Sequence, residues 1–114
     1  MAFKLLDDGI AVSPQITLDD VAEAARLGYR SIVSNRPDGE EAGQLSAEAI
    51  RQEAARHGLG FAHIPIVSGK ATEADAAAMA RALDSLPGPV LAFCRSGMRS
   101  TTLWALAKSR CGRT

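Results

Sequence analysis

Aromatic residues are scarce in this sequence, making up 4% of its 114 positions. Because Trp and Tyr so often anchor protein interfaces, this composition gives no sign of a large docking surface. Charge of one sign is lacking too, since thirteen basic residues balance thirteen acidic ones. No overall field draws the chain towards nucleic acid, so we expect no nucleic-acid partner and look for a local anion site.

Long apolar runs are missing as well. No segment approaches the roughly 18 apolar residues that cross a bilayer, and Asp7 and Asp8 interrupt the first residues too early for a signal peptide. We therefore expect no membrane partner and a cytoplasmic location. A chain of this length is the size of one domain, 1–114, with one core and one active site.

Cysteine and histidine occur only twice each. Cys94 lies in a Gly-containing turn and Cys111 near the chain end, a pattern unlike a disulfide framework, so thiol chemistry is the better interpretation. His57 is expected at a helix end and His63 on a strand, both in structural roles. Because no His, Cys and carboxylate cluster has metal-ligand spacing, we predict no metal, and we predict no cofactor.

The rest of the chain alternates between helical and extended patterns. Helices are predicted after the capping residues Thr17, Ser46 and Thr72, and a last one from Ser100 to about Lys108. Strands are predicted at 31–34, 61–64 and 90–93, with an edge hairpin formed by 3–6 and 10–12. This order indicates an α/β fold, a mainly parallel sheet with helices on both faces.

In such a sheet the loops at 35–45, 65–71 and 94–99 leave at one edge, where ligands bind. The last of them carries the sequence CRSGMRS, residues 94–100, between a buried strand and a helix start. Backbone N–H groups and the helix dipole favour an anion there, and they equally favour a thiolate at Cys94. Arg99 is the neighbouring cation, with a planar fork suited to an oxyanion. Both residues are predicted to be catalytic.

Other residues of these loops are predicted to bind substrate. Gly97 lets the N–H groups turn inwards, the hydroxyls of Ser96, Ser100 and Thr101 face sulfur or oxygen, and Arg95 lies at the rim. Two explanations remain open for Asn35 and Arg36, and also for Lys70: anion binding or a purely structural turn. The predicted substrate-binding residues are Arg95, Ser96, Gly97, Met98, Ser100, Asn35 and Arg36.

We call the loop at 94–99 the cysteine loop. Together with NRPDGEE at 35–41 and HIPI at 63–66, it resembles the phosphatase-like domain of bacterial β-lactamase-hydrolase-like proteins. That family is also catalogued as a putative sulfur transferase family. The resemblance spans nearly the whole chain. It implies a dual-specificity-phosphatase-like fold with the cysteine loop as its site. It also implies partner enzymes of sulfide oxidation, since related domains occur fused to a metallo-β-lactamase-fold oxygenase.

Three departures from cysteine phosphatases bear on the substrate. Four residues separate Cys94 from Arg99, where phosphatases have five and rhodanese sulfurtransferases have four. Phe93 replaces the usual His, and the segment after the second strand, 64–70, has no carboxylate to protonate a leaving group. Asp38, Glu40 or Glu41 is either that acid, with Asp38 the first choice, or part of a solvated turn.

The leading hypothesis is sulfur transfer from thiosulfate or a persulfide donor to a thiol acceptor through Cys94. The alternative is a phosphomonoesterase using the same Cys94 and Arg99. A third possibility is a non-catalytic sensor of oxyanions or redox state. The partners expected for the leading hypothesis are a small oxyanion substrate and a thiol acceptor.

Overall fold

The computed structural model describes residues 3–111, and the side chains of 3–109. Its elements alternate as the sequence patterns predict. The strands are β1 (Lys4–Asp7), β2 (Ile10–Ser13), β3 (Ser31–Ser34), β4 (Gly60–His63) and β5 (Val90–Phe93). The helices are α1 (Leu18–Arg26), α2 (Ala47–Arg56), α3 (Glu73–Ser85) and α4 (Met98–Cys111). No helix in this part of the chain is long and apolar enough to cross a membrane.

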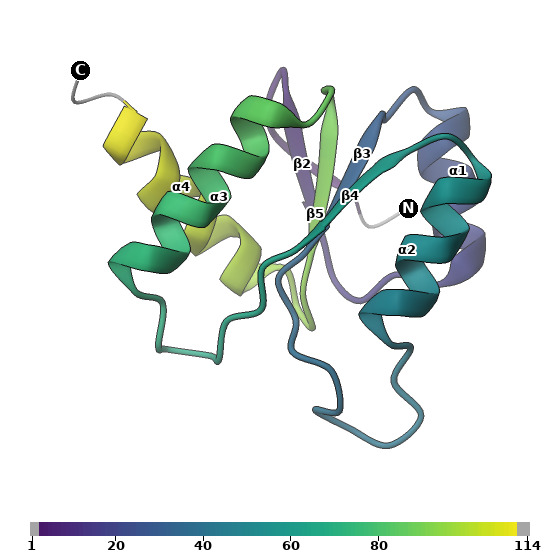
Figure 1. The fold of residues 1–114 in the computed structure, drawn as a ribbon, viewed down its shortest axis with the longest axis horizontal. Coiled ribbons are helices and arrows are strands. Elements are labelled where there is room, and N and C mark those ends of the chain that lie inside the picture. Colours follow the sequence, from purple (N-terminus) through teal and green to yellow (C-terminus); the bar gives the residue numbers. More distant parts are fainter. Residues whose placement is uncertain (1–2, 112–114) are drawn as a thin grey trace.

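One sheet joins the five strands in the order β1-β2-β5-β3-β4. Only β1 runs antiparallel to its neighbour, and β2, β5, β3 and β4 pair in parallel. Helices α3 and α4 cover one face of the sheet, and α1 and α2 cover the other (Figure 1). The predicted α/β class with helices on both faces is therefore confirmed.

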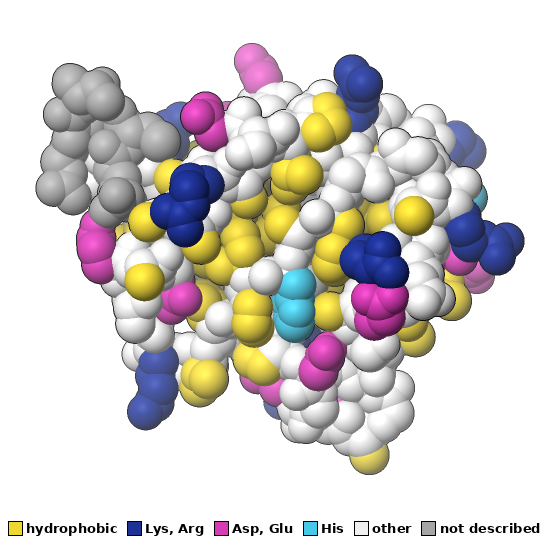
Figure 2. All heavy atoms as spheres, viewed as in Figure 1, with side chains coloured by type: hydrophobic (Ala, Val, Ile, Leu, Met, Phe, Trp, Pro, Cys, Tyr) yellow, Lys and Arg dark blue, Asp and Glu magenta, His cyan; other side chains and the backbone are white. Residues whose placement is uncertain are grey.

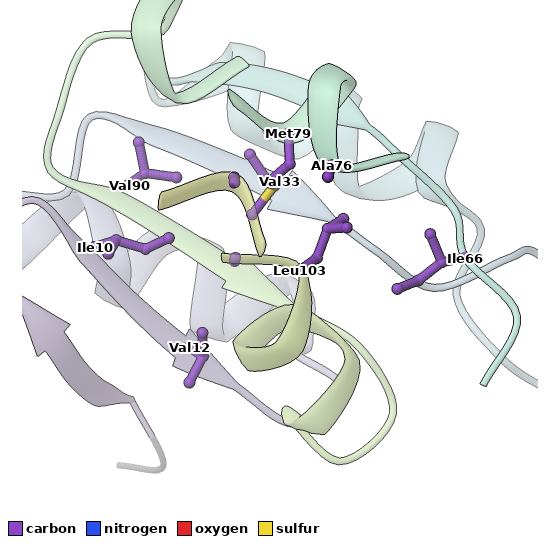
Figure 3. Packing of buried hydrophobic residues seen from close by; sticks show 10 residues of the cluster. Ile10, Val12, Val33, Ile66, Ala76, Met79, Val90 and Leu103 are labelled. Carbon is purple, nitrogen blue, oxygen red and sulfur yellow. The ribbon is translucent and has the colours of Figure 1, made fainter. Parts of the chain in front are cut away.

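Each face of the sheet has its own core. Ile10, Val33, Met79 and Leu103 pack between the sheet and the pair α3 and α4, as Figure 3 shows. On the opposite face, Ile32, Ile50, Leu91 and Phe93 form a second cluster under α1 and α2. Strand β5 contributes to both clusters and is buried along its whole length. A continuous apolar strand is the expected pattern for this central position.

Capping residues in the sequence correctly predicted where α1, α2 and α3 begin. Thr17 and Thr72 form the predicted capping boxes, and Ser46 caps α2. The predicted start of the last helix needs correction. Helix α4 begins at Met98, two residues before the predicted start at Ser100. The predicted edge hairpin is confirmed, since β1 pairs antiparallel with β2 and lies at the edge of the sheet, while β2 also pairs with β5.

The carboxyl ends of the parallel strands lie together at the lower edge of the molecule in Figure 1. The loops after β3, β4 and β5 leave the sheet there, as predicted. The cysteine loop follows β5 and therefore lies between the loop that continues β3 and the strand β2. Figure 2 shows hydrophobic side chains gathered over the middle of the viewed face, between α3 and α2, beside the edge strand β4.

Candidate active site

Cys94 lies directly after β5, at the floor of the cysteine loop, and its side chain is fully buried. The Cys94 N–H donates to Ser13 O at 3.3 Å, which ties the loop to the end of β2. Gly97 has φ of +94°, a conformation that side chains with a Cβ adopt only with strain. This turn brings the Gly97 N–H to 3.1 Å from Cys94 Sγ, where it donates a hydrogen bond.

The cysteine loop favours the thiolate form. Burial by itself would raise the pKa of the Cys94 thiol, because it removes water from a charged sulfur. Hydrogen bonds from backbone N–H groups outweigh that effect, so the pKa is lowered below its ordinary value. The donors are the N–H groups of Ser100, Ser96, Gly97 and Arg99. These groups stabilise charge on sulfur, as is expected of backbone donors at a helix start.

Arg99 is held by two acceptors from other loops. Its Nη1 and Nη2 donate to the two carboxylate oxygens of Glu40, at 2.7 and 2.8 Å, a bidentate ion pair. Nη1 also donates to Ile66 O at 2.9 Å. The side chain of Arg99 is 10% exposed, so this geometry is well shielded from water. The cation beside Cys94 is thus fixed in place by loops after β3 and β4.

Glu40 is itself shared by two arginines. Its Oε1 also accepts from Arg36 Nε at 2.8 Å, and Arg36 is almost fully buried. The hydrogen bond from Arg99 has the largest effect on the pKa of Glu40. Together with the hydrogen bond from Arg36, it outweighs the effect of burial and lowers the pKa of the carboxyl to about 2. Glu40 is therefore ionised throughout the neutral range.

A hollow of about 310 Å³ opens above the cysteine loop. Its lining residues are Glu40, Ser68, Arg95, Ser96, Met98 and Arg99. Arg95 and Met98 are exposed at its rim, and Met98 is 71% exposed. Among the described side chains, Glu40 is the one carboxylate that lines the hollow.

Three residues predicted from the loop after β3 lie outside that lining. Asn35 is fully buried and donates from Nδ2 to Ile64 O at 3.0 Å, joining the loops after β3 and β4. The Arg36 guanidinium donates hydrogen bonds to Glu40, Glu41 and Gln15. Asp38 accepts from the Ala47 N–H at the start of α2, at 2.8 Å. All three side chains are engaged in protein contacts, and a substrate-binding or acid role for them stays a prediction.

The remaining predicted side chains divide between the loop and its surroundings. The Ser100 hydroxyl is buried with no hydrogen-bond partner in the described part of the chain, and the Thr101 hydroxyl donates to Gly97 O. His63 Nε2 contacts Arg36 O at 2.9 Å, and His57 caps α2 beside Glu53. Lys70 is exposed in the loop after β4. The side chain of Cys111 lies outside the described residues.

Two contributors escaped the sequence analysis. The Ile66 carbonyl holds Arg99, and Ser68 lines the hollow. A carbonyl acceptor leaves no trace in a sequence, since every residue carries one. Within the described residues, no group of three or more His, Cys, Asp or Glu side chains is placed to hold a metal ion.

Solved structures share this fold. A candidate phosphatase of Neisseria meningitidis Z2491 superimposes with a TM-score of 0.89 and 34% identity, covering 100% of this chain and 81% of that one. Pseudomonas aeruginosa TpbA in complex with pTyr matches with a TM-score of 0.62 and 18% identity, over 84% of this chain and 54% of that one. The second likeness concerns the fold alone. The fold and the cysteine loop together define a phosphatase-like α/β domain.

The chain belongs to the family described as "Beta-lactamase hydrolase-like protein, phosphatase-like domain", which matches residues 2–111. The resemblance noted from the cysteine loop is thereby confirmed. A β-lactamase hydrolase-like protein of Xylella fastidiosa strain Temecula1 is 40% identical over 108 residues. A relative of the same description from Agrobacterium fabrum is 32% identical over 108 residues. The chain covers 25% of each of these two proteins, and 95% of its own length is matched.

Proposed function

We propose that this phosphatase-like domain is a Cys94-dependent sulfurtransferase, which takes sulfur from thiosulfate or a persulfide and passes it to a thiol. The observation that carries the proposal is the ion pair of Glu40 with Arg99, which keeps the Glu40 carboxyl ionised. Glu40 is the one carboxylate among the described residues lining the hollow, and its pKa is lowered to about 2. An ionised carboxylate cannot protonate a leaving group at neutral pH. The proposed reaction needs no such proton, because sulfite departs as a stable anion.

The chemistry divides into two displacements on sulfur. In the first, the Cys94 thiolate attacks the outer sulfur of thiosulfate, a new S–S bond forms, and the S–S bond of thiosulfate breaks to release sulfite. In the second, an acceptor thiolate attacks the outer sulfur of the Cys94 persulfide and Cys94 leaves as thiolate. Both steps balance without an added oxidant. The N–H groups around Cys94 stabilise sulfur anions before and after each transfer.

The cations beside the loop suit a small donor. Arg99 is already paired with Glu40, so the charge of that pair is largely cancelled, while Arg95 stands exposed on the lining of the hollow. We propose that Arg95 and the backbone N–H groups meet the oxyanion, and that Arg99 keeps the loop in shape beside it. The short spacing of Cys94 and Arg99 supports a cradle for one sulfur atom more than for a whole phosphoryl group.

Phosphomonoester hydrolysis is the second candidate, and the comparisons favour it. The structural relatives include candidate phosphatases and a Pseudomonas protein solved with pTyr. In this chain Cys94 would attack phosphorus, the ester oxygen would leave, and water would then release phosphate from the thiophosphate. With no neutral carboxyl lining the described hollow, this reaction is expected to be confined to aryl esters, whose oxygen leaves as an anion.

One pair of assays separates the candidates. The protein is incubated with thiosulfate and cyanide, and separately with an aryl phosphate, while intact mass is followed. We expect thiocyanate, and a one-sulfur adduct that Cys94→Ser does not form. Phosphate release without thiocyanate would overturn the lead in favour of the phosphatase. No turnover in either assay, with thiosulfate still raising the melting temperature, would instead indicate an oxyanion sensor.

The setting of the reaction is part of the proposal. A thiol acceptor persists in a reducing compartment, which fits a cytoplasmic location. Because the chain spans about a quarter of its curated relatives, further domains of such proteins are the natural place to seek a sulfide-oxidising partner enzyme. No nucleic-acid or membrane partner is proposed.

A further inference from the structure

A groove runs away from the cysteine loop, between the loop after β4 and helix α4. It encloses about 370 Å³, which is within the range of small-molecule sites. Its lining residues are Ile66, Ser68, Gly69, Ala71, Met98, Arg99, Thr102 and Leu106. Ser68, Met98 and Arg99 also line the hollow over the loop. The two spaces therefore meet at these three residues.

The groove differs from the hollow in chemistry. Met98, Thr102 and Leu106 follow one another at intervals of four along α4, which places them on one face of the helix. Met98 is 71% and Leu106 42% exposed, so apolar surface stands open to solvent beside the site. The charged residue of the lining, Arg99, is already paired with Glu40. The groove offers burial to apolar groups and little to attract a second anion.

A thiosulfate ion does not require such a space. Under the proposed function its reacting sulfur meets Cys94 at the cysteine loop, and the ion has no organic part to extend past Arg99. The acceptor, by contrast, must bring a sulfur atom to the same point and carry the rest of its structure elsewhere. The groove begins where that remainder would leave the hollow.

We propose that the groove binds the apolar arm of a small organic thiol, the acceptor of the transferred sulfur. This inference rests on the proposed sulfurtransferase function and names its acceptor class. An arm in the groove is held over Met98 and Leu106 while its sulfur faces Cys94. Acceptors with longer apolar arms therefore bind more tightly, up to the length of the groove.

The test measures the reactivity of Cys94 without requiring turnover. Alkyl methanethiosulfonates with methyl to hexyl chains react with a thiolate, which bonds to the alkyl-bearing sulfur while methanesulfinate leaves. The Cys111→Ser protein is used so that Cys94 is the sole thiol, and rates are taken from intact mass. The rate of Cys94 with each reagent is divided by the rate of a free small thiol with the same reagent. We expect this normalised rate to rise about two- to fourfold per methylene buried.

Two variants locate the effect. Leu106→Ser removes apolar lining, and Thr102→Glu sets a charge at an exposed position of the groove. Each is expected to lower the ratio of hexyl to methyl rates several-fold. Leu27→Ser, at a leucine that is 50% exposed just after α1, is the matched control and is expected to keep that ratio.

The outcomes separate this inference from the function beneath it. A hexyl-to-methyl ratio equal to that of the free thiol, or one that both groove variants leave unchanged, would overturn the apolar subsite. Failure to form thiocyanate from thiosulfate and cyanide would overturn sulfur transfer, since cyanide has no arm and does not need the groove. The alkylation ratio remains measurable in either case.

Discussion

Glu40 and Arg99, 59 positions apart in the chain, form a bidentate ion pair beside the cysteine loop. The same carboxylate binds the buried Arg36, so the order Arg36, Glu40, Arg99 runs from the interior of the loop after β3 to the edge of the hollow. A cation next to Cys94 is thus neutralised and immobilised before any substrate arrives. We treat Glu40 as a positioning residue that acts through Arg99.

Substitution of Glu40 tests this role. Glu40→Gln keeps the size of the side chain and removes its charge, so Arg99 loses its clamp and Arg36 loses a charged acceptor. Misplaced catalytic groups lose up to about 100-fold in rate, and we expect kcat for sulfur transfer to fall about 10- to 100-fold. The free energy of unfolding should fall by about 1.5–3 kcal/mol, as for other hydrogen bonds to charged groups. Steady-state kinetics and denaturant unfolding measure the two effects.

Glu41 supplies the matched control. It pairs with Arg36 through Oε1 and does not contact Arg99, and its side chain is 51% exposed. Glu41→Gln should change the free energy of unfolding little, because ion pairs in contact with water contribute little, and should leave kcat near the parent value. Equal losses of kcat in both variants would show that the loop as a whole matters and that the contact with Arg99 does not.

The contrast between Glu40 and Asp38 shows where sequence reasoning succeeded and where it stopped. Capping at Thr17 and Thr72 depends on side chains three residues away, so local spacing revealed it. Whether residue 38 or residue 40 faces the site depends on how one irregular loop turns. No periodic pattern records that turn. Asp38 is the first choice on sequence grounds, and the structure places its carboxylate on the N-terminus of α2.

The cysteine loop was predictable for a different reason. Its thiol, its glycine and its arginine lie within six consecutive residues, 94–99, so their convergence needs only a strand followed by a helix. The partners that hold Arg99 come from two other loops and include a main-chain carbonyl, that of Ile66. Contacts of this kind depend on tertiary packing, and only the structure reveals them.

Acid should weaken the same ion pair. The pKa of Glu40 is lowered from 4.5 to about 2 in the folded protein, so this carboxylate stabilises the fold above pH 4.5. That contribution is lost as pH falls from 4.5 towards about 2, because the unfolded chain takes up the proton first. The difference in unfolding free energy between the parent and Glu40→Gln should therefore shrink over this range. Urea titrations at a series of pH values measure it, and a constant difference would contradict the assignment.

Asp38 can be separated from the chemistry by a capping comparison. Its Oδ1 accepts from the Ala47 N–H, next to the Ser46 cap of α2. Asp38→Ala and Ser46→Ala should each cost about 1 kcal/mol of stability, as lost helix caps do, and should leave turnover of thiosulfate and aryl phosphate close to the parent. A general acid at Asp38 predicts something else, hydrolysis of an alkyl phosphate, whose poor leaving group needs a proton, with a loss of about 10²- to 10⁴-fold for Asp38→Ala alone.

Gly97 is expected to set the acidity of Cys94. The thiolate accepts a hydrogen bond from the Gly97 N–H at 3.1 Å, and that N–H is aimed by a φ of +94°. An added Cβ would meet Ser13 at an ordinary 3.5 Å, so the penalty of Gly97→Ala comes from its backbone conformation, at about 1–2 kcal/mol. As the loop relaxes from this conformation, the donor moves away from sulfur and the pKa of Cys94 rises towards its ordinary value.

The pH dependence of iodoacetamide alkylation measures this effect, again in a Cys111→Ser background. In the parent, the midpoint should lie below that of a free cysteine, because the pKa of Cys94 is lowered, and Gly97→Ala should move it upwards. Gly28→Ala provides the control, because Gly28 has a similar φ of +98° after α1 with open space around it. That variant should share the loss of stability and keep the parent midpoint. A midpoint unmoved by Gly97→Ala would mean that the other N–H groups of the cysteine loop suffice to hold the thiolate.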